Sequence, residues 1–262
     1  MTHHPRKRFG QNFLIDTHII KQIVAAIHPV PKQNILEIGP GQGALTAELV
    51  ASGATIDAVE IDRDLAQHLQ QEFIQYKNFH LHCADILKFE LAELAVERKT
   101  HKLRVVGNLP YNISTPLLFK LFENVNNIQD MYFMLQREVA HRLTAHPNTK
   151  EYGRMSVMAQ YYCTMQVILD VPPTAFSPQP KVHSCIVHFT PYIEPQIVVA
   201  DHALLQDIVT HAFSQRRKTI ANSLKDFISQ EELIGLQLDP KLRAENLRLM
   251  DYSNITNYLA KD

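Results

Sequence analysis

Apolar positions in the first two thirds of the chain change their period repeatedly, from helical spacing to short strand-like runs. The strand-like runs occupy residues 35–38, 55–59, 79–83, 103–106 and 131–135. Helical spacing covers residues 16–27, 44–51 and 65–76. Strands that alternate with helices are typical of a parallel sheet with helices on both faces.

Two further strand-like runs, residues 166–171 and 182–189, lie on either side of the proline-rich loop 172–180. Because only this loop separates them, we expect an antiparallel pair at the edge of the sheet. The pattern therefore predicts an α/β fold with a Rossmann-like sheet of seven strands, mixed in direction.

From about residue 194 the strand signal gives way to helical stretches at 201–213, 219–228 and 254–260. This change predicts a small all-helical domain at residues 194–262. The chain then divides into a basic N-terminal arm with the first helix (1–22), an α/β domain (23–193) and the helical domain.

The charge of the chain is nearly balanced but unevenly distributed. Of 262 residues, 45% are hydrophobic, which excludes a disordered chain, and 26 Lys and Arg oppose 27 Asp and Glu for a formal net charge of -1. Such a balance argues against a nucleic-acid partner. However, residues 1–22 and residues 211–228 each hold four basic residues against one acid, so each carries +3 and the rest carries -7.

The cysteine and histidine residues indicate the redox environment of the protein and whether it binds a metal. Cys83, Cys163 and Cys185 are odd in number and widely spaced, which suggests neither a disulfide framework nor paired CxxC zinc ligands, and the 14 histidines are scattered. We therefore expect a reducing environment and no metal. Neither an export signal nor a run of about 18 apolar residues occurs, so we expect a cytoplasmic protein without a membrane span.

Three of the eight glycines, Gly39, Gly41 and Gly43, follow the first strand-like run directly. Glycines at a strand-to-helix turn let a ligand approach the backbone, although a tight turn alone would also explain them. The spacing GxGxG, with Glu37 two residues before the first glycine, differs from the GxGxxG of dinucleotide-binding loops. It resembles motif I of the S-adenosylmethionine-dependent methyltransferases.

Two acids follow the next strands. Glu60 is 21 residues after Gly39, where a carboxylate can accept hydrogen bonds from ribose hydroxyls, and Asp85 follows the third strand-like run, where it could bind an adenine amine. Ile61 and Ile86 are candidate apolar walls. Each acid alone could be a helix cap, but both at successive strand ends favour a ligand crevice.

The segment after the fourth strand-like run, Asn108-Leu109-Pro110-Tyr111, predicts the chemistry. An adenine amine is a poor nucleophile because its lone pair is delocalised into the ring. The side-chain oxygen of Asn108 and the main-chain carbonyl of Leu109 could hold both N–H groups and direct the lone pair. Tyr111 could stack on the base and Pro110 could fix the turn, whereas the alternative is a loop that merely ends a strand.

Together these segments resemble the rRNA adenine dimethyltransferase family, and within it the bacterial small-subunit dimethyladenosine transferases associated with kasugamycin sensitivity. The similar segments are residues 11–14, 37–41, 108–116, 152–157 and 176–182, spread over nearly the whole chain. The resemblance implies a class I methyltransferase that uses S-adenosylmethionine to dimethylate two adjacent adenines near the 3′ end of 16S rRNA during ribosome assembly.

The resemblance also implies site residues. The implied cofactor residues are Asn12, Leu14, Gly39, Glu60, Asp85 and Asn108, of which residue chemistry alone would not have selected Asn12 or Leu14. The glycine loop and the apolar walls add Gly41, Ile61 and Ile86 to the predicted cofactor site. Phe176 is implied as a second stacking surface for a base taken out of its stack; an ordinary core phenylalanine is the alternative.

The two basic segments are candidate rRNA contacts, or else solvated charged faces. Their residues are Arg6, Lys7, Arg8, Arg216, Arg217 and Lys218. We expect the small ribosomal subunit as the partner and a monomeric enzyme. A large-subunit rRNA or DNA adenine methyltransferase, and an assembly or transcription factor that acts without catalysis, are the alternatives.

Overall fold

The computed structural model describes residues 11–100, 102–110 and 113–261, and the chain forms two compact units. The first comprises the described residues up to Ala140 together with Met165–Pro191, and the second comprises His141–Thr164 together with the described residues from Tyr192 on.

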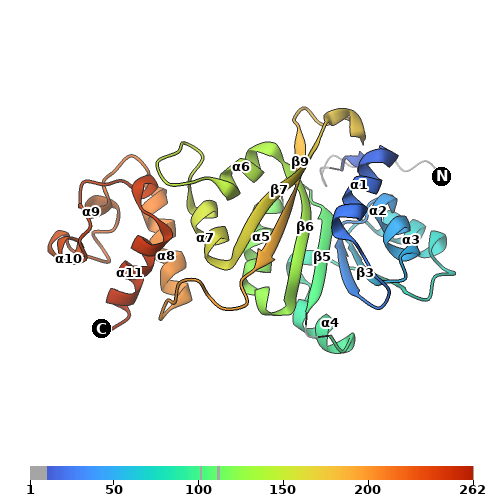
Figure 1. Cartoon of the computed structure of the whole chain (residues 1–262), viewed down its shortest axis with the longest axis horizontal. Helices are drawn as coiled ribbons and strands as arrows, with labels where there is room; N and C mark the ends of the chain where they lie inside the picture. Colours follow the sequence, from blue (N-terminus) through green and yellow to red (C-terminus); the bar gives the residue numbers. More distant parts are fainter. Residues whose placement is uncertain (1–10, 101, 111–112, 262) are drawn as a thin grey trace. The chain divides into compact units, whose positions relative to one another are not determined.

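The first unit is built on the predicted sheet of seven strands, in the order β4-β3-β2-β5-β6-β9-β7 (Figure 1). The strands are β2 (Asn34–Ile38), β3 (Thr55–Glu60), β4 (Phe79–Cys83), β5 (Leu103–Asn108), β6 (Ile128–Gln136), β7 (Cys163–Val171) and β9 (Ser184–Pro191). Strands β2 to β6 pair in parallel, and β9 pairs with β6 in the antiparallel direction. The mixed sheet is therefore confirmed.

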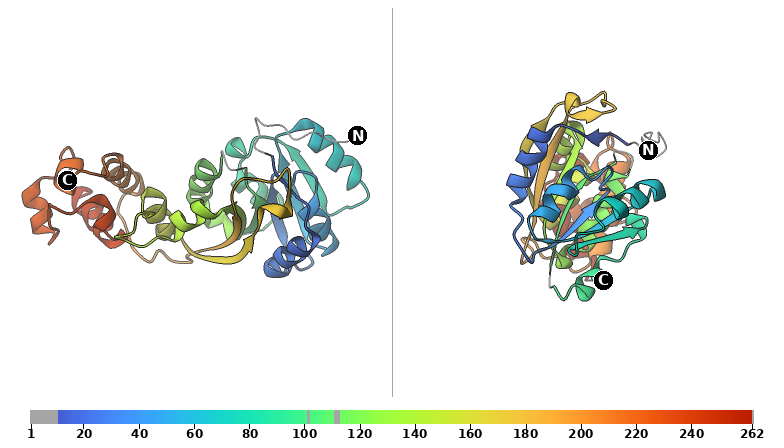
Figure 2. Two further views of the ribbon diagram at one scale, coloured as in Figure 1. Left: turned by 90° about the horizontal axis from the view of Figure 1, so that it is seen from above. Right: turned by 90° about the vertical axis from the view of Figure 1, so that its right-hand side faces the viewer.

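Helices lie on both sides of this sheet (Figure 2). They are α1 (Thr17–Ile27), α2 (Ala44–Ala51), α3 (Arg63–Glu72), α4 (Leu91–Glu97) and α5 (Ser114–Glu123), and α6 (Arg137–Thr144) follows β6. One hydrophobic cluster joins the buried sides of α1, α2 and α3 to strands of the sheet. The ring centroid of Phe122 on α5 lies 6.4 Å from that of Phe189 in β9.

Strand β5 runs two residues further than the apolar pattern predicts, so that Asn108 is its last residue. The extension depends on Gly107, because a Cβ atom there would lie 2.6 Å from the main-chain oxygen of Ile38 in the neighbouring strand. Glycine at this position lets the two strands approach where the sheet meets the predicted ligand loop.

A second, two-stranded sheet was not foreseen from the sequence. Strand β1 (Phe13–Leu14) pairs antiparallel with β8 (Phe176–Ser177), which places Leu14 opposite Phe176. Two-residue strands leave no periodic signal, so only the folded chain reveals this pairing.

The second unit is helical. Its helices are α7 (Arg154–Tyr162), α8 (His202–Ser214), α9 (Ile220–Ser223), α10 (Gln230–Gly235) and α11 (Leu249–Leu259). The hydroxyl of the buried Tyr152 donates to the carbonyl of Leu247 at 3.0 Å, and so ties the segment before α7 to the C-terminal part of this unit. The helical C-terminal region is confirmed, and residues 141–164 group with it in addition. The domain boundaries at residues 22 and 193 stay a prediction.

No helix among the described residues has the length and apolar character that a membrane crossing requires.

Candidate active site

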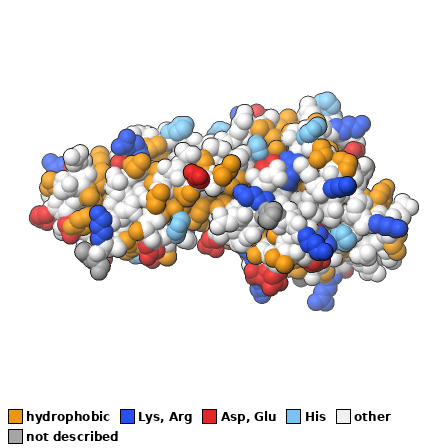
Figure 3. Space-filling view, turned by 60° about the horizontal axis from the view of Figure 1, so that its bottom comes forward, with side chains coloured by type: hydrophobic (Ala, Val, Ile, Leu, Met, Phe, Trp, Pro, Cys, Tyr) orange, Lys and Arg blue, Asp and Glu red, His pale blue; other side chains and the backbone are white. Residues whose placement is uncertain are grey.

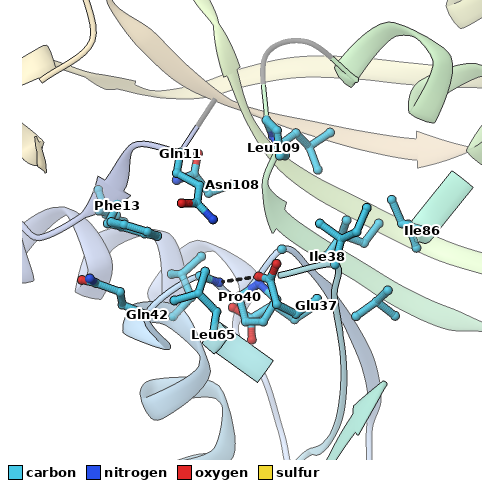
Figure 4. A pocket seen from close by; sticks show the side chains of 18 of the residues that line it. Gln11, Phe13, Glu37, Ile38, Pro40, Gln42, Leu65, Ile86, Asn108 and Leu109 are labelled. Carbon is cyan, nitrogen blue, oxygen red and sulfur yellow. Dashed lines mark hydrogen bonds between the residues drawn. The ribbon is translucent and has the colours of Figure 1, made fainter. Parts of the chain in front are cut away.

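A cavity opens at the carboxyl ends of β2, β3, β4 and β5, where the sheet meets the N-terminal segment (Figure 4). All nine residues predicted to bind a cofactor line it: Asn12, Leu14, Gly39, Gly41, Glu60, Ile61, Asp85, Ile86 and Asn108. Leu109 and Pro110 line it as well. The structure thus brings together residues that are nearly one hundred positions apart in the sequence, although their roles stay predictions.

The glycine loop between β2 and α2 forms one wall of the cavity. Gly39 and Gly41 have φ angles of 65° and 61°, a left-handed conformation that side chains disfavour. A Cβ atom at Gly41 would also lie 3.1 Å from the ring of Phe13. Both glycines are therefore required by the loop, and at Gly41 the missing side chain also makes room for the N-terminal segment.

Glu60, the last residue of β3, is held by main-chain donors. Its Oε2 accepts from the amide of Gly41 at 3.2 Å, and its Oε1 accepts from the amide of Asp62 at 2.9 Å. Burial raises the pKa of this carboxyl, and these two hydrogen bonds offset part of the effect. Because each carboxylate oxygen has a second lone pair, both can still accept from a ligand such as a ribose.

Glu37 lies at the base of the cavity and is almost completely buried. Its Oε2 accepts from the hydroxyl of Thr46 at 2.7 Å. Burial is the main cause that raises the pKa of Glu37 to about 7, with a smaller contribution from the charge of Glu60. Near neutral pH this carboxyl is therefore partly protonated.

Asp85 combines the two roles that the sequence left open. Its side chain accepts from the amide of Leu87 at 3.0 Å and so caps a short 3₁₀ turn, and the residue also lines the cavity. The neighbouring Ile86 is buried, whereas Ile61 is 49% exposed in spite of its apolar side chain. Ile61 thus presents an apolar surface at the wall of the cavity.

The acceptor loop begins at Asn108. The Nδ2 group of this side chain donates to the main-chain carbonyl of Asn12 at 3.0 Å. The next residue, Leu109, has a buried side chain, and its amide donates to the carbonyl of Met134 at 3.3 Å. The carbonyl of Leu109 is therefore the group of this residue that remains for a polar substrate contact, and its role as an acceptor stays a prediction.

The charge of the cavity discriminates between ligands. Among its described lining residues are the carboxylates of Glu37, Glu60 and Asp85, and none of these lining residues is Lys or Arg. Such a lining repels a pyrophosphate and attracts a cation. The cavity therefore fits a positively charged ligand better than a dinucleotide.

Other predicted residues lie elsewhere or cannot be placed. Phe176 is 1% exposed and belongs to the hydrophobic cluster beneath α1, so the structure buries it as a core residue would be buried. Tyr111 and the basic residues Arg6, Lys7 and Arg8 lie outside the described residues. The stacking and rRNA-binding roles of these residues stay predictions.

The three basic residues after α8, Arg216, Arg217 and Lys218, differ in their contacts. Arg216 donates through Nε to Glu245 at 2.6 Å and through Nη2 to the carbonyl of Lys150 at 2.6 Å. Arg217 and Lys218 are exposed. Elsewhere, Lys and Arg are interspersed with Asp and Glu, as one face of the molecule shows (Figure 3). Arg217 and Lys218 are thus better placed than Arg216 to meet a phosphate.

Several residues of the cavity wall were not predicted from the sequence. Gln11, Phe13, Gln42 and Leu65 line it, and Figure 4 shows Gln11 next to Asn108. Gln11 also donates through Nε2 to Asp62 at 3.2 Å. The similarity of residues 11–14 to the family was the one signal that pointed to Gln11 and Phe13.

Within the part of the chain that the structure describes, no group of three or more His, Cys, Asp or Glu side chains is arranged to hold a metal ion.

Comparison with known proteins identifies relatives over the whole length of the chain. The family described as ribosomal RNA adenine dimethylase matches residues 2–261. A protein of Yersinia enterocolitica named ribosomal RNA small subunit methyltransferase A is 50% identical over 258 residues, which cover 98% of this chain and 94% of that protein. A protein of the same name from Yersinia pestis matches with the same identity and coverage.

Solved structures agree with the fold. A dimethyladenosine transferase from Plasmodium falciparum superposes with a TM-score of 0.77 at 22% identity, covering 93% of this chain and 95% of its own. The 23S rRNA methyltransferase ErmE superposes with a TM-score of 0.69 at 25% identity, covering 95% of this chain and 99% of its own. The two structures support the predicted class of α/β sheet followed by helices.

Proposed function

Because the chain belongs to the ribosomal RNA adenine dimethylase family, we propose that it dimethylates the exocyclic amines of two adjacent adenines near the 3′ end of 16S rRNA, with S-adenosylmethionine as the methyl donor. The observation that carries this proposal is the position of Asn108 and Leu109, two acceptors at the end of β5, on the wall of a cavity lined by carboxylates.

The cavity fits the methyl donor on chemical grounds. S-adenosylmethionine supplies an electrophilic methyl group on a cationic sulfonium, and the acidic lining is complementary to that charge. Glu60 would accept from the ribose hydroxyls, Asp85 from the adenine amine, and Ile61 and Ile86 would cover the adenine faces. The left-handed turns at Gly39 and Gly41 leave room beside the main chain.

The chain activates the target amine by orienting it. Asn108 Oδ1 and the carbonyl of Leu109 accept the two N–H groups, which weakens the delocalisation of the lone pair into the ring and directs it toward the methyl group. Transfer would then be a direct in-line displacement without a covalent enzyme intermediate, in which the N–C bond forms as the C–S bond breaks, S-adenosylhomocysteine leaves and the amine loses one proton to solvent. For the second transfer, the monomethylated amine has to rotate and present its remaining N–H to one of the same acceptors.

The small subunit is the favoured acceptor because the relatives at 50% identity carry that name, whereas the similarity to the 23S rRNA enzyme is 25%. We further propose that the enzyme is a cytoplasmic monomer, that Tyr111 stacks on the target base, and that the basic residues of the arm and of the run after α8 contact rRNA.

An acceptor competition tests the proposal. The enzyme receives labelled S-adenosylmethionine with unmethylated small subunits, large subunits, naked 16S rRNA or DNA, and the modified base is then mapped. We expect small subunits to be labelled first, at two neighbouring adenines. Preferential labelling of large subunits or DNA would overturn the substrate assignment, and binding to small subunits without any label would favour an assembly factor.

The Asn108→Ala variant tests the catalytic role. We expect methyl transfer to fall at least 100-fold, in the range seen when a positioned transition-state partner is removed. Subunit binding should stay within about threefold of the parent. Comparable turnover in the variant would refute the role of Asn108 as acceptor.

A further inference from the structure

The side chain of Asn108 is held by a residue 96 positions away. Its Nδ2 group donates to the main-chain carbonyl of Asn12 at 3.0 Å. A carbonyl oxygen can only accept a hydrogen bond, so the amide has to face Asn12 with its nitrogen. The side-chain oxygen Oδ1 then points away from Asn12, and the amide has one defined orientation.

The carbonyl of Asn12 is itself fixed by contacts on both sides. Before it, Gln11 donates through its side chain to Asp62 at 3.2 Å. After it, the ring of Phe13 packs against Gly41, and Phe13 and Leu14 form the β1–β8 ladder. The segment therefore has little freedom to shift relative to β5.

One further main-chain hydrogen bond extends the β1–β8 ladder. The amide of Ile15 donates to the carbonyl of Ala175 at 2.8 Å, directly before the strand that holds Phe176. The side chain of Ile15 is 53% exposed and does not line the cavity. This hydrogen bond can thus be removed without replacing a residue of the cavity wall.

From these contacts we propose that Asn12 is a positioning residue for methyl transfer, acting through its main-chain carbonyl. It orients the amide of Asn108 so that Oδ1, and not Nδ2, meets the amine of the target adenine. The inference rests on the proposed function, because it assigns a role in that reaction. It explains why a segment at the start of the chain lies against the end of β5.

A variant with the same shape tests the orientation. In Asn108→Asp, the ionised side chain offers only acceptors and opposes the Asn12 carbonyl, although it could still accept from an amine. Once protonated, the acid can donate to Asn12 with one oxygen and accept with the other. We expect the kcat of this variant, divided by the parent value, to rise at least tenfold from pH 8 to pH 5. Asn108→Ala, which can do neither, should show a flat ratio.

If Asn108 needed only an acceptor, the Asp variant would match the parent at pH 8. Such a match would overturn the proposal, and so would a flat ratio at any level of activity.

A second pair of variants loosens the segment from outside the cavity. Ile15→Pro removes the amide that bonds to Ala175, and Ile15→Ala keeps it. We expect Ile15→Pro to lower kcat about tenfold and the affinity for S-adenosylhomocysteine, measured by calorimetry, less than threefold. Ile15→Ala should match the parent in both. Equal losses of kcat and affinity, or no loss of kcat, would contradict a positioning role.

Nuclear magnetic resonance separates this inference from the proposed function. In the parent without substrate, the Asn108 side-chain amide, labelled with ¹⁵N, should show one proton protected from exchange, and Ile15→Pro should remove that protection. A parent that transfers methyl groups without showing this protection would sink the inference alone. A protected amide in a chain that methylates no rRNA would sink the proposed function instead.

Discussion

Strand β3 carries two buried carboxylates three residues apart, Asp57 and Glu60. They differ in their hydrogen-bond partners and in the direction of their pKa shifts. Asp57 accepts from Nε and Nη2 of Arg98 at 2.7 and 2.6 Å and also contacts His82 at 2.8 Å. Burial alone would raise the pKa of Asp57, but the hydrogen bonds and charges of Arg98 and His82 outweigh it and lower the pKa. Glu60 has main-chain donors only, and its pKa is raised.

Strand β5 repeats the contrast. Near its start, Arg104 forms a buried ion pair with Asp130, at 2.8 Å from Nε and 2.9 Å from Nη2. At its end, Asn108 lies on the wall of the cavity. In the amino half of the sheet, the buried carboxylates are thus paired with cations. In the carboxyl half, no cation among the described lining residues of the cavity compensates the carboxylates. The second arrangement costs stability and is suited to a cationic ligand.

The largest effect is expected in the amino half. Arg104→Met leaves Asp130 buried without its partner, which should lower the free energy of unfolding by about 3–5 kcal/mol. Chemical denaturation measures this loss. Replacing both partners, as Arg104→Met with Asp130→Leu, should recover most of it. If the single variant loses nothing, the ion pair has no structural role and the contrast between the two halves fails.

In the carboxyl half, the same kind of change should affect binding and not folding. Glu60→Gln keeps the shape but removes the charge and one acceptor. We expect S-adenosylmethionine to bind 10- to 100-fold more weakly, which corresponds to roughly 1.4–2.7 kcal/mol. Calorimetric titration gives the affinity, and the thermal midpoint should change little, because the loss of one main-chain hydrogen bond is offset by the removal of a buried charge. A variant with a clearly lowered thermal midpoint and an unchanged affinity for S-adenosylmethionine would show that Glu60 has a structural role like that of Asp57.

Glu37 sharpens the comparison through pH. Its pKa is about 7 in the folded chain against an ordinary value of 4.5, so the folded state binds more protons between these values. The contribution of Glu37 to stability is thus present at pH 4.5 and is lost as the pH rises to 7. Without cofactor, Glu37→Gln should be more stable than the parent by about 1–3 kcal/mol at pH 8 and by much less at pH 4.5. A difference that does not change with pH would show that Glu37 is already ionised when folded.

The smallest effect concerns the basic run of the second unit, where one residue is paired and two are exposed. Arg217→Glu with Lys218→Glu should weaken subunit binding. The slope of the logarithm of the binding constant against the logarithm of salt concentration should fall by an amount that corresponds to about two phosphate contacts. Arg216→Glu should lower stability more than it changes that slope, because Arg216 is bonded to Glu245. If the slope of the double variant equals that of the parent, this run is a solvated face.

Local patterns made much of the fold and the site predictable. The seven strands follow from runs of apolar residues, and the wall of the cavity follows from glycines and acids placed directly after strands. Strand boundaries did not follow from local patterns where tertiary contacts determine them, as at Gly107, which lets β5 extend to Asn108.

What the sequence could not predict depends on partners distant in the chain. The pairing of Arg216 with Glu245, of Arg104 with Asp130 and of Asn108 with Asn12 leaves no trace in spacing. The β1–β8 ladder and the grouping of residues 141–164 with the C-terminal helices are of the same kind. Each requires the folded chain, because long-range contacts and not local periodicity determine it.

The most direct measurement titrates the unmodified chain with S-adenosylmethionine and, in a parallel calorimetric experiment, with the anionic dinucleotide NAD. If the carboxylates at the ends of β2, β3 and β4 form a receptive site for a cation, S-adenosylmethionine saturates one site per chain and NAD gives no binding heat. Saturable binding of NAD, or no binding of S-adenosylmethionine, would contradict the account.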